Sequence, residues 1–347
     1  MVSVIGWDIG GAHLKAARVE AGQVTAAAQL ATPLWQGLGS LDAAFAALRL
    51  QLGDADVHAI TMTGELCDAF ASRREGVVGL AGIAARHLKP ASPLLYAGRA
   101  GFVALEAARE HAGKIASANW RASAALVGLR LREALFIDIG STTTDLIPVV
   151  AGGVAAIGST DAERLEAGEL VYTGMARSFV MAMAARGPYA GRWTPLMNEY
   201  FASSADVHRI LGTLPDGADR MASADGRDKT AAASRIRLAR MIGREADEAD
   251  EAAWNRLAAW FAEAQLREII DAAMLRLSRR DLDDEAPVVA AGVGERVAAE
   301  AARRLGRRCI GFASLIDVGG ETAVAASQCA PAVAVALLAA ATFARLP

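Results

Sequence analysis

VIGWDIGGAHLKAAR, residues 4–18, decides the fold, because LFIDIGSTTTDLIPV, residues 135–149, repeats its design 130 residues later. Each stretch has an apolar run, an Asp-Ile-Gly turn with small or hydroxylated residues, and a second apolar run. The runs predict buried strands, and the glycines predict a hairpin turn. A turn with little side-chain bulk lets backbone N–H groups approach an anion such as phosphate. We therefore predict two phosphate-binding hairpins that face a cleft between two related halves.

An aspartate stands near the end of the first strand of each predicted hairpin, Asp8 in one and Asp138 in the other. Carboxylates in this position can hold a hydrated Mg²⁺ ion, so the pair predicts a magnesium site. The alternative for each is a turn-capping aspartate. Lys15, on the strand that leaves the first turn, is a candidate for direct contact with phosphate. A solvated lysine on the surface of the strand is an equally good interpretation. The turn residues predicted to bind phosphate are Gly10, Gly11, Gly140, Ser141, Thr142 and Thr143.

A third stretch, PVVAAGVGERVAAEAARRLG at residues 287–306, brings a short apolar strand to Gly292 and Gly294 before an amphipathic helix. In this order the three stretches resemble the first phosphate loop, the second phosphate loop and the adenosine loop of the actin, sugar-kinase and Hsp70 ATPase superfamily. The resemblance implies an α/β fold of two actin-like domains, a duplicated ribonuclease H-like architecture with an interdomain cleft. It adds Gly292 and Gly294 to the expected diphosphate-binding residues, although both also suit a tight strand-to-helix turn.

Length and composition favour a two-domain enzyme. The 347 residues suffice for two substantial cores, and the net charge of −3 offers no basic field to a nucleic acid. The three cysteines, Cys67, Cys309 and Cys329, are far apart and form no metal-binding pair. No basic leader precedes the first strand, and the apolar run Ala330–Ala344 fits a buried helix better than a membrane span. We therefore expect a cytoplasmic protein without a nucleic-acid or membrane partner.

Strand and helix signals divide the chain into two expected domains, residues 1–133 and 134–329. The first should hold strands at 24–30, 57–62 and 94–96, and helices at 40–52, 66–74, 77–88 and 119–129, the first of them capped by Ser40. A change of composition at about 187–251 predicts a helical insertion in the second domain. Ala253–Ser278 is a long amphipathic helix, and it leaves both a monomer and a homodimer open. The C-terminal helix, 330–347, should pack back on the first domain, as the superfamily implies.

Six middle strings narrow the resemblance, because they occur together and in one order. They are similar to a hydantoinase/oxoprolinase-related branch, and within it to the furan–tyramine ether synthases of methanofuran biosynthesis and their counterparts in bacteria with tetrahydromethanopterin-linked C1 transfer. The similarity runs from Val4 to about Pro331. The strings are TMTGELCDAF (61–70), SANWRASA (117–124), YTGMARS (172–178), ADVHRILG (205–212), ADGRDK (224–229) and ARMIGRE (239–245).

The narrower resemblance implies a transferase of small molecules that requires Mg²⁺. The diphosphate of an aminomethyl-furanmethanol would occupy the two hairpins. The phenolic oxygen of a γ-glutamyl-tyramine, or of a tyrosine analogue, would displace pyrophosphate and form an aryl-furfuryl ether. The alternatives are an ATP-dependent small-molecule kinase or hydantoinase/oxoprolinase-like hydrolase, and a nucleotide-gated switch or filament protein.

Several residues outside the turns would complete this site. A phenol needs a base to become a good nucleophile, and the candidates are Asp145, Glu65 and Asp161. Asp68 would pair with the substrate ammonium group, although Glu65 and Asp68 also fit helix capping. The other candidates for substrate binding are Asn119, Trp120, Arg177, Arg227 and Lys229. The competing interpretations are a core tryptophan at 120 and a solvated charged loop at 225–229.

Overall fold

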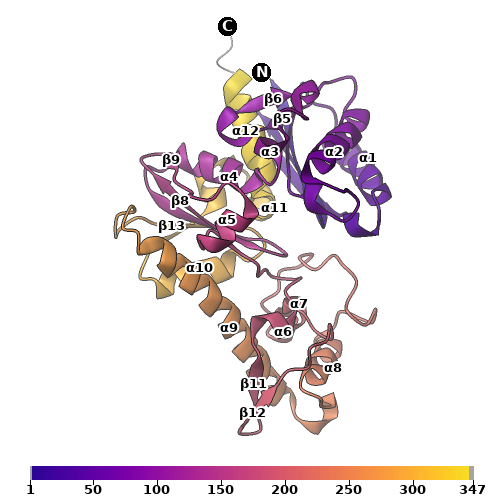
Figure 1. Cartoon of the computed structure of the whole chain (residues 1–347), viewed down its shortest axis with the longest axis vertical. Coiled ribbons are helices and arrows are strands. Elements are labelled where there is room, and N and C mark those ends of the chain that lie inside the picture. The colour runs from indigo at the N-terminus through magenta and orange to yellow at the C-terminus, as the bar shows by residue number, and fades with distance from the viewer. Residues whose placement is uncertain (1, 344–347) are drawn as a thin grey trace.

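The computed structural model describes residues 2–343 and contains two large sheets with the same strand order (Figure 1). The order is β3-β2-β1-β4-β5 in the first sheet and β10-β8-β7-β13-β14 in the second. In each order adjacent strands among the first three are antiparallel, and the last two strands run parallel to the third. This repeated order confirms the expected α/β fold of two actin-like domains.

The strands lie where the apolar runs predict them. The first sheet consists of β1 (Ser3–Ile9), β2 (His13–Glu20), β3 (Gln23–Ala31), β4 (Val57–Met62) and β5 (Leu94–Tyr96), with β6 (Phe102–Ala104) and β15 (Asp317–Val318) at its edges. The second consists of β7 (Ala134–Ile139), β8 (Thr144–Val150), β10 (Leu170–Val171), β13 (Val288–Ala291) and β14 (Cys309–Gly311), with β9 (Gly153–Val154) beside β8. Every residue of β7 and all but the first of β1 are buried, which accounts for their continuous apolar runs.

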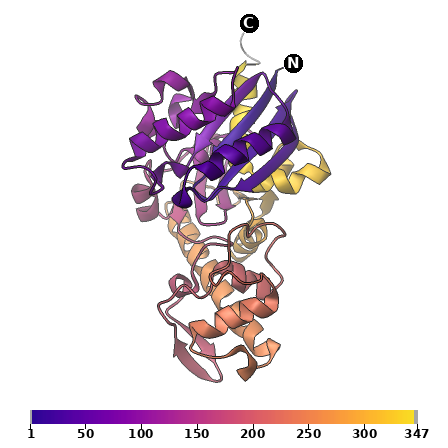
Figure 2. The ribbon, with the colours of Figure 1, turned by 90° about the vertical axis from the view of Figure 1, so that its right-hand side faces the viewer.

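Helices α1 (Gly39–Leu52) and α2 (Arg73–His87) pack on one face of the first sheet, where Trp7 and Phe45 are fully buried (Figure 2). Two of the helix predictions are wrong. α1 begins without a side-chain cap, so Ser40 does not cap it. The helix expected at 66–74 does not form, because Gly64–Leu66 makes one 3-10 turn and α2 starts only after Ser72, whose hydroxyl accepts a hydrogen bond from the Glu75 N–H.

One core joins the two sheets, and two helices lie in it: α4 (Asn119–Gly128) and the C-terminal α12 (Ala330–Phe343). α12 crosses β1 so closely that a Cβ atom on Gly6 would collide with the Ala332 carbonyl oxygen. The alanine-rich sequence of α12 permits this approach. Residues 344–347 of the predicted helix lie outside the described residues.

The chain returns to the first sheet earlier than residue 330. β15 pairs in parallel with β3, and α11 (Gly320–Gln328) also packs on β3. No single helix among residues 2–343 is long and apolar enough to span a membrane. α11 and α12 together have the length and composition of a span, but the chain bends by 104° between them. Because β1 begins the described chain and α12 ends it, both ends belong to the first lobe, the part of the molecule built on the first sheet.

The insertion forms a third unit with its own core, seen at the bottom of Figure 1. It contains α6 (Val180–Met183), α7 (Ser204–Ile210), α8 (Ala231–Met241) and the two-stranded sheet of β11 (Arg186–Tyr189) and β12 (Arg192–Pro195), so it is not wholly helical as predicted. α9 (Glu251–Leu277) runs from this unit to the second sheet, where it packs beside α10 (Glu295–Arg304). The long helix therefore ties the insertion to the second lobe.

Candidate active site

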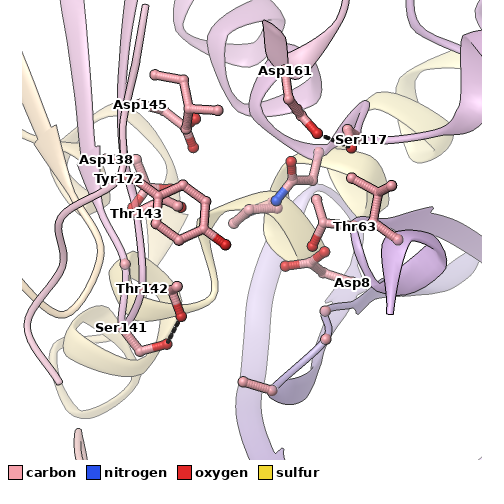
Figure 3. A pocket seen from close by; sticks show the side chains of 18 of the residues that line it. Asp8, Thr63, Ser117, Asp138, Ser141, Thr142, Thr143, Asp145, Asp161 and Tyr172 are labelled. Atoms are coloured by element: carbon pink, nitrogen blue, oxygen red, sulfur yellow. Dashed lines mark hydrogen bonds between the residues drawn. The ribbon is translucent and has the colours of Figure 1, made fainter. Parts of the chain in front are cut away.

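A cavity of about 380 Å³ lies between the two lobes, where the duplicated hairpins meet (Figure 3). The first lobe contributes Asp8, the turn Gly10–His13, Lys15, Thr63, Leu66, Arg73, Ser117, Asn119 and Pro331. The second lobe contributes Asp138, the turn Gly140–Thr143, Asp145, Asp161, Arg164, Leu165, Leu170, Tyr172 and Arg177. Both hairpins thus reach one space, as their repetition in the sequence predicts.

The two hairpins have the same backbone geometry. The Gly10 N–H donates to the His13 carbonyl at 2.9 Å, and the Gly140 N–H donates to the Thr143 carbonyl, also at 2.9 Å. These bonds close each turn over small or hydroxylated residues. Turns of this kind leave backbone N–H groups available to an anion, which the predicted phosphate role requires.

Burial controls the charge of the two aspartates. It raises the pKa of Asp8 from 3.8 to about 6 and that of Asp138 from 3.8 to about 7, against the opposing effect of Lys15. Burial alone would lower the pKa of Lys15, but Asp8 and Asp138 outweigh it and raise that pKa. The lysine therefore stays charged and keeps both carboxyl groups within reach of ionisation near neutral pH.

The aspartates suit a magnesium ion that is completed by other ligands. Asp8 Oδ1 is buried without a hydrogen-bond partner, so one carboxylate oxygen is available for a cation. Within residues 2–343, no group of three His, Cys, Asp or Glu side chains could hold a metal by itself. Mg²⁺ commonly takes one or two carboxylates and completes its shell with water and substrate phosphates. Asp8 and Asp138 fit that pattern.

A polar network crosses the cleft at the side of the cavity away from Ser141 and Thr142 (Figure 3). Arg73 of the first lobe donates to Asp161 of the second at 2.6 Å, and the Ser117 hydroxyl lies 3.3 Å from the same carboxylate. Ser117 also donates to Glu65 at 2.8 Å. Its φ of +50° is a left-handed conformation that is unfavourable for serine, and such conformations cluster at functional sites.

Asp145 is fixed from behind by a buried arginine. Arg164, on α5 (Asp161–Glu166), is 2% exposed and pairs with Asp145, and it lies 3.8 Å from Asp161. This pair fixes the position of the Asp145 carboxylate, which faces Asp138 across the second hairpin.

The loop 172–177 supports the second hairpin. The N–H groups of Met175 and Arg177 donate to the carbonyls of Gly140 and Ser141 at 3.0 and 2.9 Å. The Arg177 guanidinium donates to the Thr142 hydroxyl at 3.3 Å and lies 4.4 Å from the ring centre of Trp35 in the first lobe. Tyr172 is 69% exposed, and its side chain extends into the cavity (Figure 3).

Most of the predicted site residues line this cavity, and seven do not. Glu65 is buried behind Ser117, with its pKa raised by burial, and Asp68 is exposed outside the cavity. Trp120 lies in the core and lines a neighbouring cavity. Arg227 and Lys229 belong to the insertion, where Lys229 donates to the Asp219 carbonyl at 2.9 Å. The other two are Gly292 and Gly294, which pack behind the second hairpin.

The two glycines of the third stretch support Asp138 rather than line the cavity. A Cβ atom on Gly292, whose φ is +85°, would collide with the Asp138 carboxylate and the Ile139 carbonyl. The Gly294 N–H donates to the Ile139 carbonyl at 2.9 Å. The tight strand-to-helix turn, left open as an alternative, describes what these residues do in the fold.

Six polar lining residues are absent from the predicted set: His13, Thr63, Arg73, Ser117, Arg164 and Tyr172. Thr63, Ser117 and Tyr172 lie in three of the strings that carry the family resemblance, so that signal could have found them. Arg73 and Arg164 have the sequence context of ordinary helix arginines. Only the tertiary arrangement brings them to the cleft.

Comparison with known proteins identifies relatives over most of the chain. The sequence profile of the hydantoinase/oxoprolinase family matches residues 56–341. The (4-{4-[2-(gamma-L-glutamylamino)ethyl]phenoxymethyl}furan-2-yl)methanamine synthase of Methanocaldococcus jannaschii is 29% identical over 305 residues, covering 86% of this chain and 88% of the relative. The synthase of the same name from Methanococcus vannielii is 32% identical over 111 residues, covering 32% of this chain and 50% of the relative.

Solved structures resemble the chain in fold alone. Nucleotide-free acetone carboxylase aligns with a TM-score of 0.54 at 11% identity, covering 95% of this chain and 70% of that one. Component A of the (R)-2-hydroxyglutaryl-CoA dehydratase of Acidaminococcus fermentans aligns with a TM-score of 0.49 at 13% identity, covering 99% of this chain and 100% of that one.

Proposed function

Because the chain belongs to the hydantoinase/oxoprolinase family, and because its relatives are synthases of an aryl-furfuryl ether, we propose that it forms such an ether. The name of the relatives describes a furan with an aminomethyl group, joined through a CH₂–O bond to the ring of a γ-glutamyl-tyramine. We propose an aminomethyl-furanmethanol diphosphate as the donor and the free phenol of γ-glutamyl-tyramine, or of a tyrosine analogue, as the acceptor. The product would serve the biosynthesis of a methanofuran-type cofactor.

The reaction balances without ATP. The phenolic oxygen forms a bond to the furfuryl CH₂ carbon, and the bond from that carbon to the diphosphate oxygen breaks. The electron pair leaves with pyrophosphate, and the phenolic proton passes to a base. The furan oxygen stabilises positive charge on the CH₂ carbon, so departure of the leaving group can run ahead of attack.

The two hairpins are suited to the departing diphosphate. Backbone N–H groups of the turns, the hydroxyls of Ser141, Thr142 and Thr143, and the Lys15 ammonium group would bind its oxygens. Asp8 and Asp138 would hold Mg²⁺. When bound, Mg²⁺ supplies positive charge that stabilises the leaving oxygens. Charge on the leaving group is the main demand of this reaction, so these residues carry most of the expected rate enhancement.

The opposite side of the cavity is suited to the acceptor. Asp161 lines the cavity, and its carboxylate is oriented by Arg73 and Ser117. We propose that Asp161 accepts the phenolic proton, since Glu65 does not line the cavity and Asp145 faces Asp138 across the hairpin that would bind the diphosphate. Donor and acceptor would then approach each other from the two sides of one space.

The observation that carries the proposal is the cavity in which two matched anion-binding hairpins face an oriented carboxylate. The test is to incubate the protein with Mg²⁺, the furfuryl diphosphate and γ-glutamyl-tyramine without ATP, and to measure pyrophosphate release and the ether by mass spectrometry. Ether and pyrophosphate in equal amounts support the proposal. ATP hydrolysis stimulated by a small metabolite, with no ether from either phenol, would replace it with an ATP-dependent kinase or hydrolase.

A further inference from the structure

A second cavity, of about 430 Å³, lies next to the first, and Ser117 lines both. Its walls come from the turn Gly98–Ala100, from α3 (Ala112–Ile115), from the start of α4, and from Ser159 of the second lobe. Ser117 and Asp161 stand together on the shared side of the first cavity (Figure 3). A ligand that reaches Asp161 can therefore extend past Ser117 into the second cavity.

All charged side chains that line the second cavity are basic. Arg99, Lys114 and Arg121 line it, and none of its twelve lining residues is acidic. No ion pair or side-chain hydrogen bond joins these three cations to any residue between 2 and 343. Burial lowers the pKa of Arg121, and the neighbouring Arg99 lowers it further. Cations gathered without a carboxylate partner are the arrangement that an anionic ligand would satisfy.

Two features besides the charged side chains also favour an anion in the second cavity. α4 begins at this cavity, where the Asn119 side chain accepts a hydrogen bond from the Trp120 N–H and the N-cap residue Ala118 makes none, and the positive end of the helix favours negative charge there. Trp120, which also lines the cavity, is 3% exposed, and its indole Nε1 has no hydrogen-bond partner within the described chain. The hydroxyl of Ser159 provides a further hydrogen-bond donor in the lining.

We infer that the second cavity binds the carboxylate end of the phenolic acceptor, an inference that rests on the proposed function. With the phenol beside Asp161, the glutamyl carboxylate passes Ser117 and pairs with Arg121 and Lys114. The donor diphosphate remains over the hairpins in the first cavity. The pocket thus selects an acceptor whose tail ends in a carboxylate. It places the specificity for that carboxylate in the first lobe rather than in the insertion residues Arg227 and Lys229.

The test compares binding of two phenols by titration calorimetry, without turnover. γ-Glutamyl-tyramine carries an α-carboxylate beside an α-ammonium group, whereas N-acetyl-tyramine keeps the amide and lacks both. In Arg121→Gln and, separately, in Lys114→Gln, we expect the Kd for γ-glutamyl-tyramine to rise about tenfold and that for N-acetyl-tyramine to stay unchanged. Arg109→Gln, which removes an exposed arginine outside both cavities, is the matched control and should alter neither Kd.

Three results would overturn the inference: no binding of γ-glutamyl-tyramine to the wild type, equal Kd values in wild type and both variants, or weaker binding of pyrophosphate in the variants. The last result would assign the cavity to the donor. Ether formation is measured separately. A chain that binds the acidic tail through Arg121 but makes no ether refutes the proposed reaction and leaves the tail pocket standing.

Discussion

Lys15 and Asp145 occupy the same position in the two duplicated hairpins, where each pairs with a buried aspartate on the neighbouring antiparallel strand. Lys15 faces Asp8, and Asp145 faces Asp138. The hairpins therefore agree in backbone and differ in charge at one position. Lys15 lowers the pKa of both buried aspartates, whereas Asp145 raises both. This asymmetry gives the lysine a measurable role in the pH dependence of the site.

Replacing Lys15 by methionine should move the acidic limb of the pH–rate profile to higher pH. In the wild type the limb should lie near pH 6–7, where Asp8 and Asp138 ionise. Without the lysine, both carboxyl groups lose a neighbour that favours their charged form, so they ionise only at higher pH. The measurement is kcat/KM for pyrophosphate release from pH 5 to 9. Lys89→Met, on an exposed residue, should leave the limb in place. A limb that moves to lower pH in Lys15→Met would contradict this assignment.

Replacing Asp138 by asparagine should stabilise the protein at alkaline pH while it abolishes activity. The pKa of Asp138 is about 7 in the folded chain and 3.8 as an ordinary aspartate, so between these values the folded chain binds more protons and stability falls as pH rises. Asparagine removes that loss, which is worth up to about 4 kcal/mol. Thermal unfolding should show a higher Tm for the variant at pH 8 and no difference near pH 4. Asp284→Asn, at an exposed position, should show no such pH dependence.

Asp161→Asn should lower kcat by about 100-fold if this carboxylate accepts the phenolic proton. The KM for the furfuryl diphosphate should stay within about twofold, because the hairpins that bind it are unchanged. Glu166→Gln, on the same helix but exposed and outside the cavity, is the matched control. A variant that loses donor binding and kcat together would instead assign Asp161 to the cleft architecture through its pair with Arg73.

Gly6→Ala should destabilise the fold, because its Cβ would collide with the backbone of α12. Overpacking against a backbone that cannot rotate away costs about 1–3 kcal/mol. Gly82→Ala is the matched control: this glycine lies inside α2 with open space around it, and alanine there should stabilise by about 0.5–1 kcal/mol. Urea unfolding of the two variants should give shifts of opposite sign. A neutral Gly6→Ala would mean that α12 can move away from β1 without loss.

The hairpins could be predicted from the sequence because their signal is local and repeated. Asp8 and Asp138 sit in matching strings, and a strand that is buried on both faces must be apolar throughout. The structure shows the same repetition in the strand order of the two sheets. A local pattern of this kind predicts the structure well, because the residues that form the turn are all within one short segment of the chain.

Long-range placement could not be read in the same way. Arg227 and Lys229 form a charged loop in the sequence, yet both lie in the insertion outside the cavity, where Lys229 pairs with Asp219 and Arg227 is exposed. Arg164 looks like a surface helix residue but is buried against Asp145. Which charged residue reaches a cleft depends on contacts between segments far apart in the sequence, and a single sequence does not contain that information.

The early return of the chain to its first sheet has a consequence for synthesis on the ribosome. β15, α11 and α12 complete the lobe to which β1 belongs, and they are the last described elements to emerge. The second lobe, from β7 to β14, is continuous in the chain and can assemble as soon as it is translated. The N-terminal lobe is therefore the first to be synthesised and the last to be completed. Its surface over Gly6 stays uncovered, and accessible to chaperones, until α12 emerges.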